Sequence, residues 1–429
     1  MLRQLDRVRS LAESQREARV RVLEAIAWPP EVEAAFFAHK AQRLPEVTYT
    51  IDREGHEARI QELQAAEDQV DGDDPIAGWL RATVRSVMDA HRLTLAAGTQ
   101  EFYRLSRALY GGAHSRFHGN EERNIDLAEH LLARLRVHGW DEARDPEEPR
   151  LTAEETAAEF RRRLTRDYPS MAVEVVVDER CTAKVLAGQS RVRVRRGAEF
   201  HPWELDGLWH HEVETHVLSA QNGALQRHVP FLRAGGPRTT RTQEGLAVFA
   251  ELHNHSLTTS RMERLARRVK LVAMAEEGAD FLELYRYLTG LGVEAREAFL
   301  DAQRICRGGR VQGGAPFTKD ACYLAGLLDV HAFLAAVVRG GFRDETELLV
   351  CGRIDLEDVH ALVLLRQHGV LKRPRYLPPW LRRWRTLLPE FAFTSFLADV
   401  NLQAVEAHYR GLIDAASRAS PPESSHGIS

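Results

Sequence analysis

The stretch His210-His211-Glu212-Val213-Glu214-Thr215-His216 decides how this chain is interpreted. Two histidines, with a glutamate directly after the first of them, lie inside a run of helix-forming residues. The usual pattern of a metal-dependent hydrolase separates its two histidines by four positions, so that both imidazoles leave one face of the helix. Here His211 and His216 are five positions apart. Five residues turn the side chain by roughly 140° around a regular helix, against about 40° for four.

The two imidazoles can therefore share one ion only if the helix is locally widened. A single π-type turn, with i→i+5 hydrogen bonds, would do this, and such turns are rare and frequently lie at functional sites. The sequence predicts either a metal site on a distorted helix or no metal site in this segment.

Bulk composition limits the class of protein. The chain has 429 residues, 44% of them hydrophobic, which is enough for a large core in one elaborated domain or in two or three. Its net charge of −4 gives no indication of a nucleic-acid or membrane partner, and nothing in it specifies an oligomeric state. Arginine-rich stretches at 191–196, 261–268 and 373–385 are balanced by acidic ones, so we expect solvated faces there.

The cysteines and the first residues of the chain indicate the cellular compartment. The four cysteines are far apart and form no CxxC pair, which is typical of a reducing compartment. Residues 1–7 contain no apolar signal region, and we identify no apolar run that approaches eighteen residues. We expect a soluble cytoplasmic protein without a membrane or nucleic-acid partner.

Helical periodicity dominates the chain, and we expect a predominantly helical α+β fold. Alternating residues predict strands at 172–177 and 190–195, with a third short strand within 181–186. This small sheet would lie beside the helix expected over 203–223. The other expected helices cover 1–26, 76–95, 98–109, 124–138, 152–167, 240–255, 259–276, 279–290, 293–306, 318–339 and 395–416. Capping boxes are predicted for Thr152 with Glu155 and for Thr240 with Gln243.

A catalytic zinc site needs a third protein ligand besides two histidines, with the fourth position left to water. Glu244 is a candidate, in the first turn of the helix that Thr240 would open. Gly245 beside it lets another backbone pass close. His211, His216 and Glu244 would then form the two-histidine, one-glutamate ligand set of thermolysin-type enzymes. Glu212 would point toward the open position and act as the general base on a water.

Other pairings of the same residue types stay open. His210 and Glu214 are four residues apart and would face together without any widening of the helix. His253 and His255 are rival third ligands, although they diverge on a helix. Glu251 lies seven residues after Glu244 on the same face, so it is a rival carboxylate.

A second cluster of candidate residues lies between 304 and 323. Two glycine pairs frame a loop here, and Thr318 is a natural N-cap for the following helix. Lys319 and Tyr323 share a face of that helix, and Arg304 and Arg307 fall on one side of the preceding one. These cations suit an anion such as a substrate's terminal carboxylate, and Tyr323 would donate to an oxyanion. The alternative is a flexible loop with ion-paired arginines.

Taken in order, these motifs resemble a known family. They are His211-Glu212-Val213-Glu214-Thr215-His216, Gln243-Glu244-Gly245-Leu246-Ala247, Arg307-Gly308-Gly309 and Phe317-Thr318-Lys319-Asp320 with Tyr323. A further motif is Gly98-Thr99-Gln100-Glu101-Phe102-Tyr103-Arg104-Leu105-Ser106. Together they resemble the bacterial flavohemoglobin expression-modulating QEGLA-motif proteins, which are similar to the microtubule-associated tyrosine carboxypeptidases of animals. The resemblance runs from about residue 75 to 375.

The resemblance implies zinc on His211, His216 and Glu244, with Glu212 catalytic, in a zincin-like core. For the animal members it implies removal of a C-terminal tyrosine from a protein tail; the bacterial members have no tubulin to act on. We expect an N-terminal helical extension over 1–74, a metallopeptidase domain over 75–375, a C-terminal helical segment over 376–418 and a disordered tail over 419–429. The leading hypothesis is a zinc-dependent carboxypeptidase acting on a peptide or protein C-terminus. The alternative is a metal-binding regulatory or interaction protein without turnover.

Overall fold

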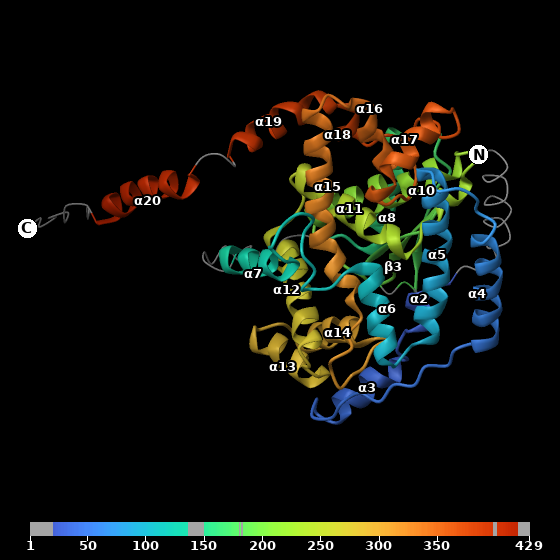
Figure 1. The fold of residues 1–429 in the computed structure, drawn as a ribbon. Coiled ribbons are helices and arrows are strands. Elements are labelled where there is room, and N and C mark those ends of the chain that lie inside the picture. The colour runs from blue at the N-terminus through green and yellow to red at the C-terminus, as the bar shows by residue number, and fades with distance from the viewer. Residues whose placement is uncertain (1–19, 136–149, 180, 182, 398–400, 419–429) are drawn as a thin grey trace, which may run out of the picture.

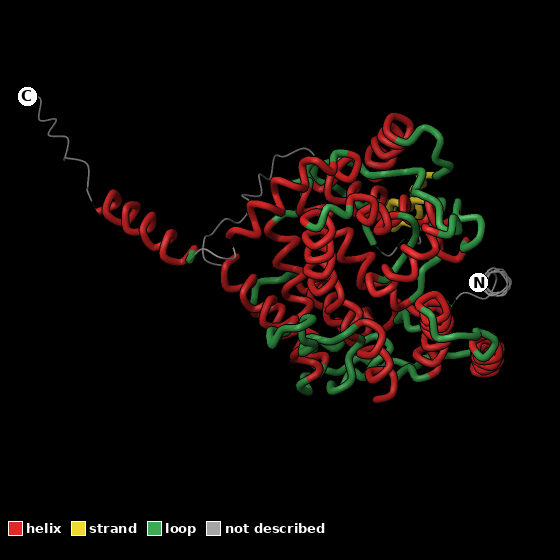
Figure 2. The backbone as a smooth tube through the Cα atoms, turned by 45° about the horizontal axis from the view of Figure 1, so that its top comes forward, coloured by secondary structure: helices red, strands yellow, loops and turns green. Residues whose placement is uncertain are grey.

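The computed structural model describes residues 20–135, 150–179, 181, 183–397 and 401–418 of the chain. These residues form a predominantly helical body with one three-stranded sheet (Figures 1 and 2). The expected helical α+β class is therefore confirmed.

Helices precede the sheet along the chain. They are α2 (Val22–Ala25), α3 (Pro30–Ala38), α4 (Arg53–Glu67), α5 (Pro75–Leu95), α6 (Gln100–Tyr110), α7 (Asn124–Leu135) and α8 (Ala153–Asp167). Thr152 and Glu155 form the expected capping box at the start of α8, each side chain bonded to the other residue's backbone N–H. Of the predicted helices, residues 1–19 of the first and 136–138 of the fourth lie outside the described residues.

The sheet has the order β1–β3–β2. β1 (Glu174–Asp178) pairs in parallel with β3 (Arg191–Arg195), and β2 (Val185–Ala187) pairs antiparallel with β3 on the other side. Because side chains alternate along a strand, β3 buries Val192 and Val194 and turns its arginines outward. All three strands lie within or next to the predicted segments, and β2 forms an edge of the sheet next to the helix that carries the histidines.

That helix is regular at its ends and widened in the middle. It comprises α9 (Glu204–Leu208), a π-helix η2 (Trp209–Val217) and α10 (Leu218–Ala224). Of the two possibilities left by the five-residue histidine spacing, the structure shows the distorted helix, with π-type geometry over the whole motif. Buried Trp209, Val213 and Val217 anchor this segment in the core beneath the sheet.

Further helices follow this segment along the chain. They are η3 (Pro230–Arg233), η4 (Pro237–Thr239), α11 (Thr240–His253), α12 (Thr259–Glu276), α13 (Phe281–Gly290), α14 (Ala295–Cys306), η5 (Thr318–Ala321) and α15 (Cys322–Arg339). Among them, α11 packs directly on η2. Smaller elements follow: α16 (Arg343–Thr346), η6 (Glu347–Val350), η7 (Leu356–Asp358), α17 (Val359–Gln367), α18 (Pro379–Arg382) and η8 (Trp384–Thr386).

Helical structure begins at Thr240 and at Thr318 as predicted, but the N-terminal caps predicted there are wrong. The Thr240–Gln243 capping box is absent because the 3₁₀ turn η4 runs directly into α11, so Thr240 is already helical and Glu244 falls in the second turn. Thr318 is not an N-cap, because it lies inside η5 and its hydroxyl bonds to the Ser106 hydroxyl, at 2.9 Å. In both cases a 3₁₀ turn that the local pattern does not show takes the place of the predicted cap.

The C-terminal part also differs from expectation. Instead of one helix over 395–416, the chain forms α19 (Leu387–Leu397) and α20 (Leu402–Arg418), with Asn401 outside both. α19 packs on α15, whereas α20 projects from the body (Figures 1 and 2). The tail predicted to be disordered, 419–429, lies outside the described residues.

The segment Thr318–Arg339, made of η5 and α15, contains an 18-residue window with a mean hydropathy of 1.9. By length and composition alone it is apolar enough to cross a membrane, so the expectation that no such stretch exists is wrong. In the protein, however, 67% of that window is buried. It packs along α11 and α19, as a core helix does.

The crossing of α11 and α15 is unusually close. A Cβ atom built on Gly245 would overlap the backbone of Gly326, and one built on Gly326 would overlap the carbonyl oxygen of Arg241. The two glycines therefore let the helix backbones touch. This contact sets the distance between Glu244, next to Gly245, and the residues at the start of α15.

Replacing Gly245 with alanine should push these two helices apart. We expect a loss of about 1–3 kcal/mol in the free energy of unfolding, as for other overpacked cores, measured by urea denaturation. Gly78→Ala in α5 is the matched control, because no atom lies within 4 Å of its built Cβ. That substitution should raise stability by roughly 0.5–1 kcal/mol. Equal stability of the two variants would contradict the close crossing.

Candidate metal centre

His211, His216 and Glu244 converge in the structure. The π-helix η2 turns both imidazoles toward α11, and their rings lie 4.9 Å apart between centroids. Oε2 of Glu244 lies 3.6 Å from Nε2 of His211 and 3.5 Å from Nε2 of His216. One donor atom from each of the three residues lies within 4.8 Å of the other two, so the group can hold a metal ion.

The spacing of these donors fits a tetrahedral ion. Ligand atoms bound to zinc at about 2.0–2.2 Å are separated from each other by roughly 3.3–3.6 Å in tetrahedral geometry. Both nitrogen–oxygen distances agree with that separation. Two imidazoles and one carboxylate also leave one position of a tetrahedral ion for water or substrate.

Lys319 holds the other oxygen of Glu244. Its ammonium donates to Oε1 of Glu244 at 2.9 Å, so only Oε2 faces the histidines. Burial alone would raise the pKa of Glu244, but the Lys319 ammonium and the two histidines hold it well below its usual range. The carboxylate is therefore charged and ready to bind a cation.

Glu251 lies on the far side of the His211 ring. Its Oε1 is 2.6 Å from Nδ1 of His211, while Arg261 approaches the same carboxylate at 3.3 Å and 3.4 Å. Burial lowers the pKa of His211, but its contacts with Glu244 and Glu251 outweigh burial and raise that pKa to about 10. In sequence Glu251 was a rival third ligand; in the structure it contacts the nitrogen of His211 that faces away from Glu244.

Glu212 contacts the sheet edge. Its Oε2 accepts a hydrogen bond of 2.9 Å from the backbone N–H of Ala187 in β2. Sequence reasoning missed this contact, because nothing local links the two residues across 25 positions. It places the carboxylate between the metal-binding helix and the edge strand.

The remaining rival ligands lie elsewhere. His210 pairs with Glu214 at 2.7 Å, as their four-residue spacing predicts, and Glu214 also accepts a bond of 3.1 Å from the Tyr168 hydroxyl. His253 contacts Glu390 of α19 at 3.1 Å. His255 is not one of the three converging residues. It follows α11 in a left-handed backbone conformation, with φ of 56°.

The second predicted cluster, between residues 304 and 323, lies next to the three converging residues, because Lys319 contacts Glu244. Lys319 lies 3.5 Å from the Tyr323 hydroxyl and contacts that ring's face, at 5.1 Å from its centroid. Burial and the nearby Glu244 carboxylate raise the pKa of Tyr323 to about 12, so it remains a hydrogen-bond donor. Lys319 and Tyr323 therefore share a helix face as predicted, and Lys319 also contacts Glu244, which the sequence did not indicate.

The two arginines of this cluster differ from each other. Arg304 is bonded to both oxygens of buried Asp320, at 2.7 Å and 2.8 Å. Arg307 lies over the Phe317 ring, at 5.8 Å, and its buried Nε has no hydrogen-bond partner among the described residues. Burial and the neighbouring Arg304 lower the pKa of Arg307 to about 10. Of the two guanidinium groups, that of Arg307 therefore has fewer hydrogen-bond partners.

The arginines of α12 lie next to Arg304 and Asp320. The stretch 261–268 was expected to be a solvated face, but the side chains of Arg267 and Arg268 are only 12% exposed. Both point to Asp301 of α14, at 4.0 Å and 3.7 Å, and Arg268 also lies 3.7 Å from Asp320. The expectation failed because α14 covers this face; the spacing of Arg261, Arg264 and Arg268 on one side of the helix was the available signal.

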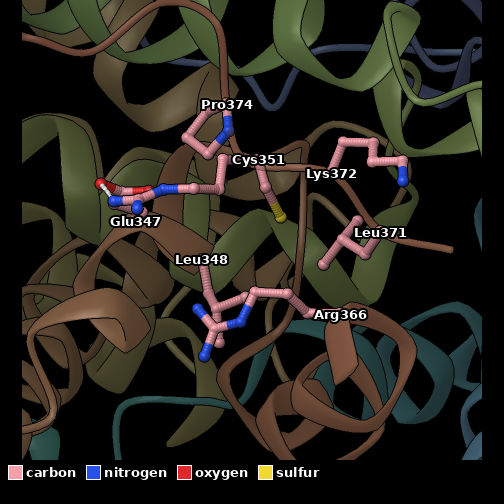
Figure 3. A pocket seen from close by; sticks show the side chains of 8 residues that line it. Glu347, Leu348, Cys351, Arg366, Leu371, Lys372 and Pro374 are labelled. Atoms are coloured by element: carbon pink, nitrogen blue, oxygen red, sulfur yellow. Dashed lines mark hydrogen bonds and ion pairs between the residues drawn. The ribbon is translucent and has the colours of Figure 1, made fainter. Parts of the chain in front are cut away.

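A separate small pocket contains none of the predicted site residues. It lies between η6 and residues 371–374 and is lined by Leu348, Cys351 and Leu371, with the Glu347–Arg373 ion pair on its wall (Figure 3). Burial raises the pKa of the Cys351 thiol to about 12, so it is not a reactive thiolate.

The geometry predicts one divalent ion per chain. His211→Ala and Glu244→Ala should each remove a ligand and lower the metal affinity of the stripped protein by at least a hundredfold, beyond the roughly 10–100-fold typical of outer-shell losses. Titration with a competing chromophoric chelator measures this. His253→Ala is the control and should bind as the unaltered chain does. An unchanged affinity in Glu244→Ala would contradict the three-ligand group.

Known proteins can now be compared with this arrangement. A comparison with curated proteins finds no match. A model of the microtubule-associated tyrosine carboxypeptidase family matches residues 34–399, which include every residue of the metal group and of the cationic cluster. The match covers well over half of the chain, so this protein belongs to the microtubule-associated tyrosine carboxypeptidase family.

Proposed function

We propose that this protein is a zinc-dependent carboxypeptidase with a zincin-like core, which removes the C-terminal residue of a peptide or protein. The single observation that carries the proposal is the convergence of His211, His216 and Glu244 on one point. Two imidazoles with one carboxylate and an open position are the ligand set of catalytic zinc. Family membership supports carboxypeptidase activity, with a C-terminal tyrosine as the residue removed. A cytoplasmic location is part of the proposal.

The metal would supply the Lewis acid. Bound zinc lowers the pKa of a water from about 15.7 to about 7 and polarises a carbonyl group. The protein's own residues must then move protons and orient the substrate. We assign these tasks to Glu212, to Tyr323 and to the cations Lys319 and Arg307.

Glu212 is the candidate general base. It would accept a proton from the attacking water, so that the oxygen adds to the scissile carbonyl carbon. The same carboxyl group would then give the proton to the departing amine nitrogen as the C–N bond breaks. The Ala187 N–H holds one carboxylate oxygen at 2.9 Å, which fixes the side chain without occupying its other oxygen.

The substrate's terminal carboxylate needs a cation near the scissile bond. Lys319 is adjacent to the ligand Glu244, and Arg307 offers an Nε that no described residue satisfies. A carboxylate bound by charged donors gains about 1.5–3 kcal/mol per hydrogen bond. Tyr323, protonated at neutral pH, would donate to the oxygen that becomes negative as the water adds.

A second candidate function is a metal-binding regulatory protein without turnover. The retained Glu212 argues against it, because a protein that only holds a metal needs no carboxylate at that place. The ordered bond from Ala187 supports the same conclusion, since it presets the orientation of the carboxylate. The two functions differ in one measurable property, the dependence of peptide cleavage on Glu212.

Glu212→Gln should separate metal binding from catalysis. We expect the variant to keep its metal, because Glu212 is not one of the converging ligands. Its kcat should fall by about 10²–10⁴, the usual contribution of a general acid–base residue. Cleavage of a peptide library with free C-termini, followed by mass spectrometry, measures this. Normal cleavage by Glu212→Gln would rule out the proposed mechanism.

Arg307 and Arg304 should respond differently to removal. Arg307→Ala should raise KM for peptides with a free C-terminus by roughly 10–100-fold, the value of one or two charged hydrogen bonds, while stability changes little. Arg304→Ala should instead destabilise the fold by about 3–5 kcal/mol, because Asp320 is 2% exposed and would lose its bidentate partner. C-terminally amidated peptides are the substrate control. An unchanged preference for the free carboxylate in Arg307→Ala would refute this assignment.

A further inference from the structure

We propose that Glu251 is a positioning residue for the metal, fixing the ring of His211 so that Nε2 faces the ion, and that Arg261 keeps Glu251 in this role. The inference rests on the proposed metal site. Glu251 belongs to the same helix as the ligand Glu244, seven residues further along.

The two nitrogens of His211 have different neighbours. Nε2 faces Glu244 at 3.6 Å, while Nδ1 is 2.6 Å from Oε1 of Glu251. Because the nitrogens lie on opposite edges of the ring, Glu251 cannot bind the ion that Nε2 binds. A carboxylate at Nδ1 keeps the proton there, which leaves the lone pair of Nε2 free for a metal.

Glu251 is itself held on several sides. Arg261 of α12 contacts both of its oxygens, at 3.3 Å and 3.4 Å, and the side chain is 5% exposed. Gly207 of α9 also lies close, because a Cβ built on it would be 4.0 Å from Oε2 of Glu251. The carboxylate therefore has little freedom to rotate toward the metal position.

Each carboxylate of α11 has its own cation. Lys319 bonds Glu244 and Arg261 bonds Glu251, so two chemically identical side chains on one helix face take different roles. The ligands also differ from each other: among the residues that the structure describes, no hydrogen bond reaches Nδ1 of His216. The ring of His211 is thus the one that the protein fixes in advance.

The structure contains a matched control in the same π-helix. His210 contacts Glu214 through Nδ1 at 2.7 Å, and Glu214 is 2% exposed. This pair joins the same two groups at nearly the same distance as His211–Glu251, with His210 17% exposed against 9% for His211, but its histidine is not one of the three converging residues. A change that reflects only the loss of a buried His–Glu contact would appear equally in both pairs.

The experiment measures zinc affinity of the full-length protein by chelator competition in Glu251→Ala, Glu251→Gln and Glu214→Gln. We expect Glu251→Ala to weaken binding by about 10–100-fold and Glu251→Gln by roughly tenfold, as for other outer-shell partners of metal-bound histidines. Glu214→Gln should stay within about twofold of the unaltered chain, well below that range. ¹⁵N NMR of the loaded protein should show the proton of His211 on Nδ1, and a loss of this preference in Glu251→Gln.

The outcomes distinguish the two proposals. If the unaltered chain binds zinc and cleaves peptides but Glu251→Gln binds as tightly as Glu214→Gln, the role of Glu251 is refuted and the proposed function stands. If the unaltered chain binds no zinc, both are refuted. Should Glu251→Ala fail to fold, the isosteric Glu251→Gln decides. Equal losses of affinity in Glu251→Gln and Glu214→Gln would show a structural contact instead of a positioning role.

Discussion

The site depends on the contact between the backbones of α11 and α15 at Gly245 and Gly326. Helices that carry side chains at their crossing lie about 8–10 Å apart, and two facing glycines allow a closer approach. Glu244 precedes Gly245, and Lys319 lies one short turn before α15. The close crossing therefore brings a carboxylate and an ammonium from distant parts of the chain to 2.9 Å. Neither would be tolerated at this depth alone, since a buried charge needs a partner.

The π-helix η2 solves a second geometric problem. A regular helix would spread His211 and His216 over two faces, whereas the widened segment directs both to Glu244. Widening also disturbs the backbone hydrogen bonds, and the Thr215 hydroxyl donates to the His210 carbonyl oxygen at 2.9 Å. The apolar side of the same segment is buried against the sheet, so core packing stabilises a backbone form that is rare by itself. Metal geometry and core packing thus act on opposite faces of one element.

Features set by nearby residues could be predicted from the sequence, and those set by distant contacts could not. The π-type turn follows from the spacing of His211 and His216, and the capping box of Thr152 from its neighbour three residues later. The capping box predicted for α11 was wrong because a preceding 3₁₀ turn continues into the helix. The meeting of Glu251 with His211 joins residues 40 positions apart, and the burial of Arg268 depends on α14. The sequence pattern indicates which residue types form the site. Helix packing determines that Glu244, and not Glu251, faces Nε2 of both histidines.

Charge balance explains why the metal group can exist before any ion arrives. The side chain of Glu251 is 5% exposed and that of Glu244 is 14% exposed, and their negative charges are met by Arg261 and Lys319. Contacts with the two carboxylates raise the pKa of His211 to about 10, so its protonated ring adds one more positive charge between them. A metal bound at Nε2 of His211 must displace a proton from that ring, because only the neutral imidazole is a ligand. Since Glu251 stabilises a proton on Nδ1, the proton that leaves is the one facing Glu244. Lys319 and Arg261 therefore balance the charges of Glu244 and Glu251, and the contact of Glu251 with Nδ1 determines which nitrogen of His211 becomes free for the cation.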